Sequence, residues 1–381
     1  MKKIVKGAGF ILIVAVALII MWRHTKVKVD QQALEVGQVK DVTFPDRVEK
    51  TINSHFSYDA IVVTGEKFNS TACHQATATL QKIQKKKWKE LFLDKNKNWK
   101  EEDNTTADRE ENDIPLKIYE DQDGTTLNLS DIDALYWKHP DMKYISQIFG
   151  TDQYYPYKDI FKQETELNFI DKASALEKIK TDLKKLGINS DLISVRATYS
   201  LDINALNTVE QKCIADGSME QKDAKLLWDE QDEGYYVFIS QVSQDLPMFI
   251  TNDLNTYATD KAANDSIEVF DTPRGYKYLR LQNWFDIQVQ DQAYQLVPIE
   301  KIMETLDQKY QNVTDKNNIT VKTFKLYEYP QFVDKGKYNV IPIWICSVAI
   351  DGEDSEGNAF ETEISVPINA VTGKEMIEME E

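Results

Sequence analysis

The run Val340–Ile350, with the sequence VIPIWICSVAI, decides the fold that we predict for this 381-residue chain. It consists mainly of β-branched and aromatic residues, which is typical of a buried strand. An acidic turn at Asp351–Asn358 and a second apolar run at Phe360–Ile368 complete a predicted hairpin. Upstream, Ile299–Tyr310 has apolar residues at helical spacing, and Ile319–Tyr327 is typical of a strand. We therefore predict a helix followed by antiparallel strands in this part of the chain.

The same order of elements is predicted earlier in the sequence. Ala173–Leu186 carries apolar residues three and four positions apart, and Gly187 follows as a helix C-cap. Strand patterns at Leu192–Tyr199 and Tyr235–Val242 come next. This recurrence favours two related α+β units, each with a helix on one face of its sheet.

The region before these units has less regular patterns. Tyr58–Thr64 is typical of a strand, Ala72–Leu93 of a helix, and Asp94–Asn112 of an exposed polar loop. Ile114–Leu129 contains a central Asp-Gly pair and predicts a hairpin, because this pair tolerates positive φ. A short helix is expected at Asp131–Tyr136.

The first residues predict a membrane anchor. The apolar run Gly7–Trp22 lies between basic side chains on both sides, and it can span a bilayer if Lys6 extends its amine to the headgroups. A cleaved signal peptide is the alternative, but bulky and basic residues, Met21 to His24, stand where cleavage requires small ones. We expect a single uncleaved span with a cytoplasmic N-terminus and the long following domain outside the cell.

The charge of the chain limits its partners. The net charge is −18, and the part after the predicted anchor is more acidic still, because the first 28 residues hold basic side chains and no acids. Such a domain repels phosphate backbones, so we predict no nucleic-acid binding. It could attract basic partners, although charge of this kind also serves solubility alone.

The C-terminus resembles a known family. The segment from Val340 through Pro342 and Trp344, with the ending Asn369-Ala-Val-Thr-Gly373, resembles PepSY-like domains, especially the YycH/YycI-type membrane-anchored regulators of bacterial sensor kinases. Overall, the chain resembles uncharacterised surface proteins of Gram-positive bacteria that carry a domain of unknown function. The resemblance covers roughly residues 170–377 and implies an extracytoplasmic α+β body that acts on a partner. Trp344 beside Pro342 is expected to anchor a core, and Asn369 and Gly373 to form a turn.

Together, these patterns predict an α+β protein in four parts. Residues 1–28 are the membrane anchor, and residues 29–165 are an α+β region of unknown type. Residues 166–290 and 291–381 are then the two PepSY-like units, each a helix with an antiparallel sheet.

Signatures of catalysis or metal binding are weak. Cys73 and His74 are neighbours on the predicted helix and would point about 100° apart, which is poor geometry for a catalytic pair. Whether Cys73 pairs with Cys213 is left open by the sequence. The segment starting at Asp94 begins like a calcium loop but lacks its glycine and closing glutamate, and Asp351–Gly357 is acidic at a hairpin tip. We interpret both as solvated turns and predict neither a metal nor a cofactor.

An aromatic tract supplies the remaining candidate surface. Its exposed members would contact a partner or ligand, although such tracts more often belong to a core. The residues are Trp137, Tyr144, Tyr154, Tyr155 and Tyr157. We predict a non-enzymatic, membrane-anchored extracytoplasmic protein that binds or regulates an envelope protein or a sensor kinase. The alternatives are an envelope hydrolase with paired carboxylates and a module that binds cell-wall glycan or peptide.

Overall fold

The computed structural model describes residues 43–65, 68, 72–107, 113–139, 141–149, 157–250, 265–312, 317–334, 336–353 and 358–376. The chain divides at Gln38, and Val39–Glu381 forms one compact body. The predicted anchor lies outside the described residues, as do Tyr154 and Tyr155. Within the described ranges, no helix combines the length and the apolar character needed to cross a bilayer.

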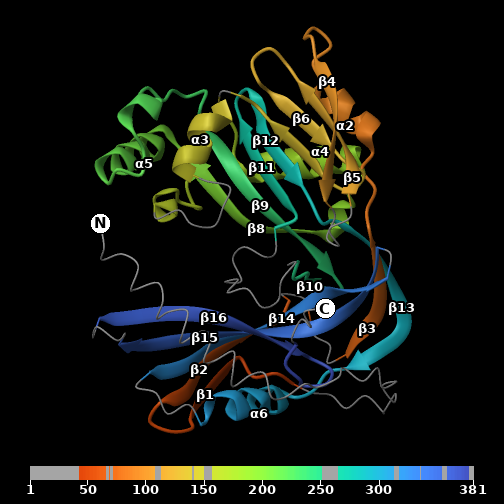
Figure 1. Cartoon of the computed structure of the whole chain (residues 1–381), viewed down its shortest axis with the longest axis vertical. Coiled ribbons are helices and arrows are strands. Elements are labelled where there is room, and N and C mark those ends of the chain that lie inside the picture. Colours follow the sequence, from red (N-terminus) through yellow and green to blue (C-terminus); the bar gives the residue numbers. More distant parts are fainter. Residues whose placement is uncertain are drawn as a thin grey trace, which may run out of the picture. The chain divides into compact units, whose positions relative to one another are not determined.

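The first sheet has seven strands, in the order β1-β2-β14-β15-β3-β13, with β16 also paired to β15 (Figure 1). The strands are β1 (Arg47–Thr51), β2 (Phe56–Val63), β3 (Ala72–Leu80), β13 (Phe285–Gln295), β14 (Asn318–Asp334), β15 (Lys337–Glu353) and β16 (Ala359–Asn369). β2 runs parallel to β14, and the other pairs are antiparallel.

β15 has different partners along its length. β14 occupies one side throughout. On the other side, β3 pairs with Lys337–Val340, and β16 pairs with Ile343–Glu353. We call the point between Val340 and Ile343, where β3 leaves β15 and β16 begins, the fork.

The second sheet has nine strands, in the order β10-β9-β11-β12-β7-β6-β5-β4, with β8 also paired to β9. The strands are β4 (Lys100–Ala107), β5 (Asp113–Glu120), β6 (Thr126–Leu129), β7 (Ala134–Trp137), β8 (Ile193–Leu201), β9 (Gly234–Ser243), β10 (Leu246–Pro247), β11 (Ile267–Thr272) and β12 (Gly275–Leu281). All of these pairs are antiparallel.

The described helices are short, and two of them are capped by aspartate side chains. They are α2 (Lys85–Phe92), α3 (Asp141–Phe149), α4 (Lys172–Leu186), α5 (Ile203–Ala215) and α6 (Ile299–Tyr310), with 3₁₀ turns at Lys158–Ile160, Ser190–Leu192 and Gln221–Asp223. The Asp171 and Asp202 side chains accept hydrogen bonds from backbone N–H groups at the starts of α4 and α5. Gly187 ends α4 in the left-handed conformation, with φ of 98°.

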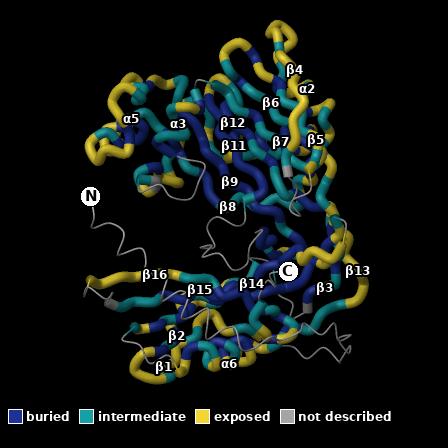
Figure 2. The backbone as a smooth tube through the Cα atoms, in the orientation of Figure 1, coloured by how far each residue is buried: buried dark blue, intermediate teal, exposed yellow. Residues whose placement is uncertain are grey.

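Both sheets contain buried residues (Figure 2), and their apolar side chains pack beneath these helices. α6 packs on the first sheet, where Phe324 and Trp344 are fully buried. On the second sheet, Tyr235 lies in the cluster beneath α2 and α4. Its neighbour Tyr236 points to the opposite face and joins the cluster with α3 and α5. The second sheet therefore has helices on both faces.

The predicted α+β class is wrong, because the described body is mostly β-structure in two sheets. Strands from the region preceding residue 166 complete both sheets: β1–β3 join β13–β16, and β4–β7 join β8–β12. The body therefore does not consist of two helix-plus-sheet units that follow one another along the chain. Local helix patterns were a poor guide here because pairing between distant segments determines the class.

Some of the elements predicted from local sequence patterns are confirmed, and others are wrong. The predicted helix Ala72–Leu93 is wrong, since strand β3 and helix α2 occupy it, and β7 replaces the short helix at Asp131–Tyr136. The predicted loop Asp94–Asn112 contains β4. The hairpin at Ile114–Leu129 is confirmed as β5 and β6, and the helix Ile299–Tyr310 is confirmed as α6.

Candidate functional site

The predicted turn at the C-terminal motif is confirmed. Asn369 ends β16, and its Oδ1 accepts hydrogen bonds from the backbone N–H groups of Val371 and Thr372, both at 2.9 Å. Gly373 has φ of 71°. The Thr305 hydroxyl, on α6, donates to the Gly373 carbonyl at 2.5 Å. The motif thus fastens the end of β16 to the helix, which is a structural task.

Pro342 and Trp344 lie on β15 in this same region. Trp344 is fully buried under α6, as expected of a core anchor. Pro342 pairs with Glu328 of β14 across the sheet, and its carbonyl accepts a hydrogen bond from the N–H of Ala370 at 3.0 Å. Pro342 therefore lies at the fork, next to the buried Glu328, which is not part of the C-terminal motif.

The aromatic tract lies partly buried at the edge of the α3–α5 cluster. Trp137 makes an edge contact with Tyr278, with 5.7 Å between ring centroids. Tyr144 packs against the same cluster, and the Tyr157 hydroxyl donates to Asp216 at 2.7 Å. The structure thus brings Trp137, Tyr144 and Tyr157 to one cluster. Their role as a partner or ligand surface stays a prediction.

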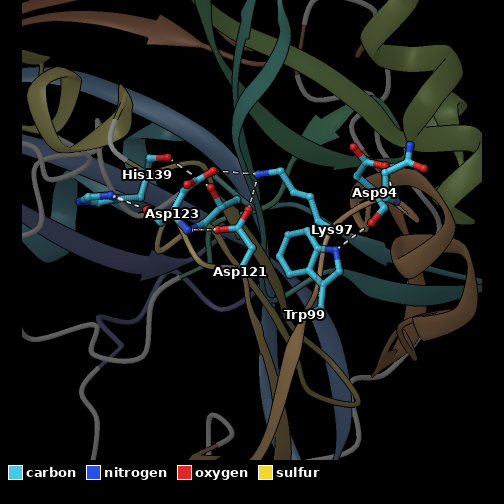
Figure 3. Close-up of polar contacts among 8 residues, drawn as sticks. Asp94, Lys97, Trp99, Asp121, Asp123 and His139 are labelled. Carbon is cyan, nitrogen blue, oxygen red and sulfur yellow. Dashed lines mark hydrogen bonds and ion pairs between the residues drawn. The ribbon is translucent and has the colours of Figure 1, made fainter.

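A polar network surrounds the turn between β5 and β6 (Figure 3). The Lys97 amine contacts the carboxylates of both Asp121 and Asp123, the latter at 3.1 Å. Asp94 orders the preceding turn, because its Oδ1 accepts from Asn96 N–H at 2.9 Å and its carbonyl accepts from Trp99 Nε1 at 3.0 Å. The segment that begins like a calcium loop thus contains Lys97, and the positively charged amine of Lys97 contacts two carboxylates.

Asp121 is the buried centre of this network. Its Oδ1 accepts hydrogen bonds from the backbone N–H groups of Asp123 at 2.9 Å and Thr125 at 3.0 Å. Burial by itself would raise the pKa of Asp121, but hydrogen bonds from Lys97 and these two N–H groups outweigh it and lower the pKa. His139 Nδ1 lies 2.8 Å from the Asp123 carbonyl oxygen and donates to it (Figure 3). Lys97 offsets part of the charge of the two carboxylates, and the network stabilises the hairpin.

In the part of the chain that the structure describes, no three His, Cys, Asp or Glu side chains lie close enough together to bind a metal ion. A shallow concavity of about 530 Å³ lies over β1 and β2. Its charged walls pair with one another, since Arg47 contacts Asp59 and also Glu49, the latter at 2.7 Å. This concavity offers mixed, mutually neutralised charge.

The most perturbed acid lies at the fork. Glu328 of β14 is 1% exposed. Its Oε1 accepts a hydrogen bond from Gln244 Nε2 at 2.6 Å, whereas its Oε2 has no hydrogen-bond partner among the residues that the structure describes. Burial raises the pKa of Glu328 to about 8, against smaller opposing effects of Ser243 and Gln244. The side chain is therefore mainly a neutral carboxylic acid at pH 7.

The turn that covers Glu328 is conformationally unusual. Gln244 and Asp245 join β9 to β10 with φ of 49° and 65°, a region that non-glycine residues rarely adopt. Gly65, which follows β2, crosses this turn so closely that a Cβ on it would lie 1.7 Å from the Asp245 carbonyl oxygen. The β9–β10 turn of the second sheet thus packs directly against the residue that follows β2 of the first sheet.

Cys73 and His74 flank this junction on β3. The Cys73 side chain is buried, and burial, followed by the charge of Glu328, raises the pKa of its thiol. The His74 ring is exposed, with Nδ1 3.1 Å from the carbonyl oxygen of Gln290. Successive side chains of a strand point to opposite faces, so the two do not form a catalytic pair. The expected poor geometry holds, although β3 replaces the predicted helix.

All three cysteines are free and buried, so Cys73 and Cys213 are not paired. Cys73 lies in the α6 cluster, whereas Cys213 lies on α5 in the α3–α5 cluster. Sequence reasoning did not select Glu328 or Gln244. A signal was present, because Glu328 interrupts the apolar and aromatic run from Leu326 to Pro330.

Comparisons with known proteins establish the fold alone. No family model matches the chain, and no curated protein matches it. The crystal structure of an uncharacterised protein from Eubacterium rectale is similar, with a TM-score of 0.60 and 14% sequence identity. The similarity covers 88% of this chain and 94% of that protein. The fold is therefore shared with a bacterial protein at low sequence identity.

Proposed function

We propose that the chain is a bacterial envelope protein, held at the membrane by Gly7–Trp22, whose folded body binds a protein partner outside the cytoplasm without catalysing a reaction. The observation that carries the proposal is the boundary between a basic-flanked apolar run and an acidic body that begins at Val39. Only a short segment of sequence separates this run from the body, so the run can anchor the body to the membrane.

The polar clusters of the body favour binding over catalysis. Asp121 and Asp123 share Lys97 as a counterion, and the Lys97 amine contacts both carboxylates. Glu328 is enclosed at the fork with 1% exposure, where a substrate has no access to it. Both groups serve the fold. The C-terminal resemblance to membrane-anchored kinase regulators also supports partner binding over catalysis.

Membrane topology is tested first with added cysteines. The native thiols are buried, so a membrane-impermeant maleimide should give low background. Lys95→Cys places a thiol on an exposed site of the body, and Lys3→Cys places one before the apolar run. In intact Gram-positive cells, we expect labelling of the Lys95→Cys variant alone, and labelling of both after lysis. Protection of the Lys95→Cys variant until lysis would refute the proposed location.

Partner binding is tested by photo-crosslinking in the same cells. A photoreactive amino acid is placed at exposed positions, such as Glu361 on β16 and Glu230 in the turn before β9. A discrete crosslinked protein that depends on the position of the probe is expected. Crosslinks to lipid or to the chain itself alone, at every position, would contradict partner binding.

A further inference from the structure

The segment Ala224–Trp228, which follows α5, presents two adjacent leucines to solvent. Leu226 is 50% exposed, and Leu227 is 83% exposed, the highest value among the large apolar side chains that the structure describes. A single exposed apolar side chain is ordinary on a protein surface, but neighbouring ones that the fold leaves uncovered mark a candidate contact surface. We call Leu226 and Leu227 the leucine tip.

Glu210 of α5 fixes the backbone beneath the leucine tip. Its side chain is buried; Oε1 accepts a hydrogen bond from the Lys225 N–H at 2.7 Å, and Oε2 accepts one from the Leu226 N–H at 3.0 Å. On either side of the tip, Ala224 and Trp228 pack against the α3–α5 cluster. The body therefore holds the leucine tip in one conformation, although the two leucine side chains lie in solvent.

The backbone of Leu226 is strained. Its φ is 65°, in the left-handed region that a bulky side chain rarely adopts. Glycine or asparagine would enter this region at a lower cost. Strained positions persist only where the surrounding structure holds them, and they concentrate at functional sites. A leucine serves this turn poorly, so its exposed side chain is the feature that requires an explanation.

Acidic residues flank the leucine tip along the chain. The segment Asp216–Glu233 contains seven acids and two lysines. Both lysines already contact acids of the same segment, because Lys222 pairs with Glu220 at 2.8 Å and Lys225 pairs with Asp232. Asp229 and Glu230, just after the tip, are exposed. The surface thus combines a small apolar projection with an excess of negative charge.

We infer that the leucine tip inserts into an apolar pocket of the protein partner, and that the rim of this pocket carries lysine or arginine. Burial of the two leucines drives such an interaction. A segment that is already held in its bound conformation loses little conformational entropy on binding. The basic rim pairs with the acids beside the tip and selects the partner. The inference rests on the proposed function and deepens it by naming the surface and the chemistry of the partner.

Two other occupants fit this surface less well. The headgroups of anionic lipids would meet the acids that flank the tip, so a membrane surface repels the segment. A second copy of this chain would bring the same acids together, and the net charge of −18 adds to the repulsion. A pocket with a basic rim on another protein removes both repulsions.

The first test uses the full chain in intact Gram-positive cells. A photoreactive leucine analogue replaces Leu227, and in a matched variant it replaces Val333, which is 52% exposed at the end of β14. We expect a discrete crosslinked protein from position 227 alone. The crosslinked peptide of that protein should contain apolar residues flanked by lysine or arginine. Crosslinks from position 227 to lipid only or to a second copy only, or equal crosslinking from both positions, would overturn the inference.

The apolar contact is tested by substitution, with the photoreactive probe at Glu230. Leu227→Asp should lower the yield of the crosslinked partner at least about tenfold, which corresponds to about 1.4 kcal/mol. Because the side chain is largely exposed, the free energy of unfolding should stay nearly unchanged. Val333→Asp, the matched control, should leave the yield unchanged. An undiminished yield from the Leu227→Asp variant would show that the leucine tip does not enter the partner.

The basic rim is tested with the probe at Leu227. Asp223→Lys with Glu230→Lys reverses charge beside the tip and should lower the yield several-fold. Glu164→Lys with Glu361→Lys makes the same change of charge at exposed glutamates elsewhere and should have little effect. Equal effects of the two double variants would refute a basic rim.

Failure of this inference differs from failure of the proposed function. A protein that is crosslinked from Glu361, but never from Leu227 or Glu230, would confirm a partner and exclude the leucine tip as its binding surface. Crosslinks to no protein at any of these positions would contradict partner binding itself.

Discussion

The Gln244 side chain makes the two hydrogen bonds with the His74 backbone that a neighbouring strand would otherwise make. The Gln244 Oε1 accepts a hydrogen bond from the His74 N–H at 2.8 Å, and Nε2 donates to the His74 carbonyl at 2.9 Å. The same Nε2 also donates to Glu328. Because β3 has left β15 at the fork, a side chain from the second sheet completes the ladder of the first. The Gln244 amide therefore links the two sheets.

Gln244→Ala should lower the free energy of unfolding by about 1–3 kcal/mol, because the backbone groups of His74 and the buried Glu328 lose their partner. Hydrogen exchange at the His74 amide should accelerate. Asp245→Asn is the control: it leaves an Asx residue at the neighbouring positive φ and should be nearly neutral. Equal effects of the two substitutions in urea unfolding would show that the turn, and not the amide, carries the stability.

Glu328 should make stability depend on pH above the acidic range. Its pKa is raised from 4.5 to about 8 by burial, so between these values the folded protein keeps a proton that the unfolded chain has lost. Unfolding free energy should then fall as pH rises from about 4.5 to 8, by up to about 1.4 kcal/mol per pH unit from this group, and no further above it.

Glu328→Gln isolates that effect, since the amide has a similar shape and does not titrate. The variant should gain stability relative to the parent as pH rises from 5 to 8, in denaturant titrations at several pH values. The groups that face Glu328 are the uncharged Ser243 and Gln244 and the Cys73 thiol, whose pKa burial alone keeps raised in both proteins, so none of them titrates between pH 5 and 8. A stability difference that does not change with pH would refute the prediction.

Lys97 should stabilise the β5–β6 hairpin mainly at neutral pH. The lowered pKa of Asp121 adds stability above its unfolded pKa of about 3.9, and this stability is lost as pH falls through the folded value. Lys97→Met should therefore cost about 1–2 kcal/mol at pH 7 and less at pH 3. Lys95→Met, which removes an exposed lysine two residues away, should be nearly neutral in the same unfolding measurements.

The three thiols should be inert in the folded protein. Burial raises the pKa of Cys73 and Cys346 strongly and that of Cys213 to a lesser degree, so little reactive thiolate forms near pH 8. Ellman's reagent should titrate close to none of them in the native state and all three after denaturation. Only one thiol titrated after denaturation would indicate a disulfide between two of the three cysteines and contradict the structure.

Local periodicity predicted the helices that pack on a sheet. In α6, Ile302 and Leu306 recur at helical spacing, and the predicted bounds match the structure. β3 shows the opposite case, because its alanines and glutamine favour a helix in isolation. Pairing with β13 and β15 makes it a strand, in which Ala76 and Ala78 fit beneath larger side chains. Tertiary packing overrode propensity there.

The fork could not have been located from the sequence. Gln244 and Glu328 are 84 residues apart, and their contact depends on two sheets whose strands alternate along the chain. An acid within an apolar strand is a warning sign, but it does not identify the partner. The C-terminal turn, by contrast, was predictable, because Asn369 bonds residues only two and three positions ahead.

Gly65→Ala should be among the more destabilising small substitutions in this body. Its added Cβ would lie 1.7 Å from the Asp245 carbonyl oxygen, and Gln244 holds that turn in place from the other side. We expect a loss of about 2–3 kcal/mol in unfolding free energy, since overpacking forces the backbone to shift. Gly336→Ala is the matched control, with φ of 71° and nothing within 4 Å of the new atom. It should cost about 1 kcal/mol from backbone strain alone. If Gly65→Ala proves the milder of the two, then the β9–β10 turn is free to move away from β2, and Gln244 does not fix the junction of the sheets.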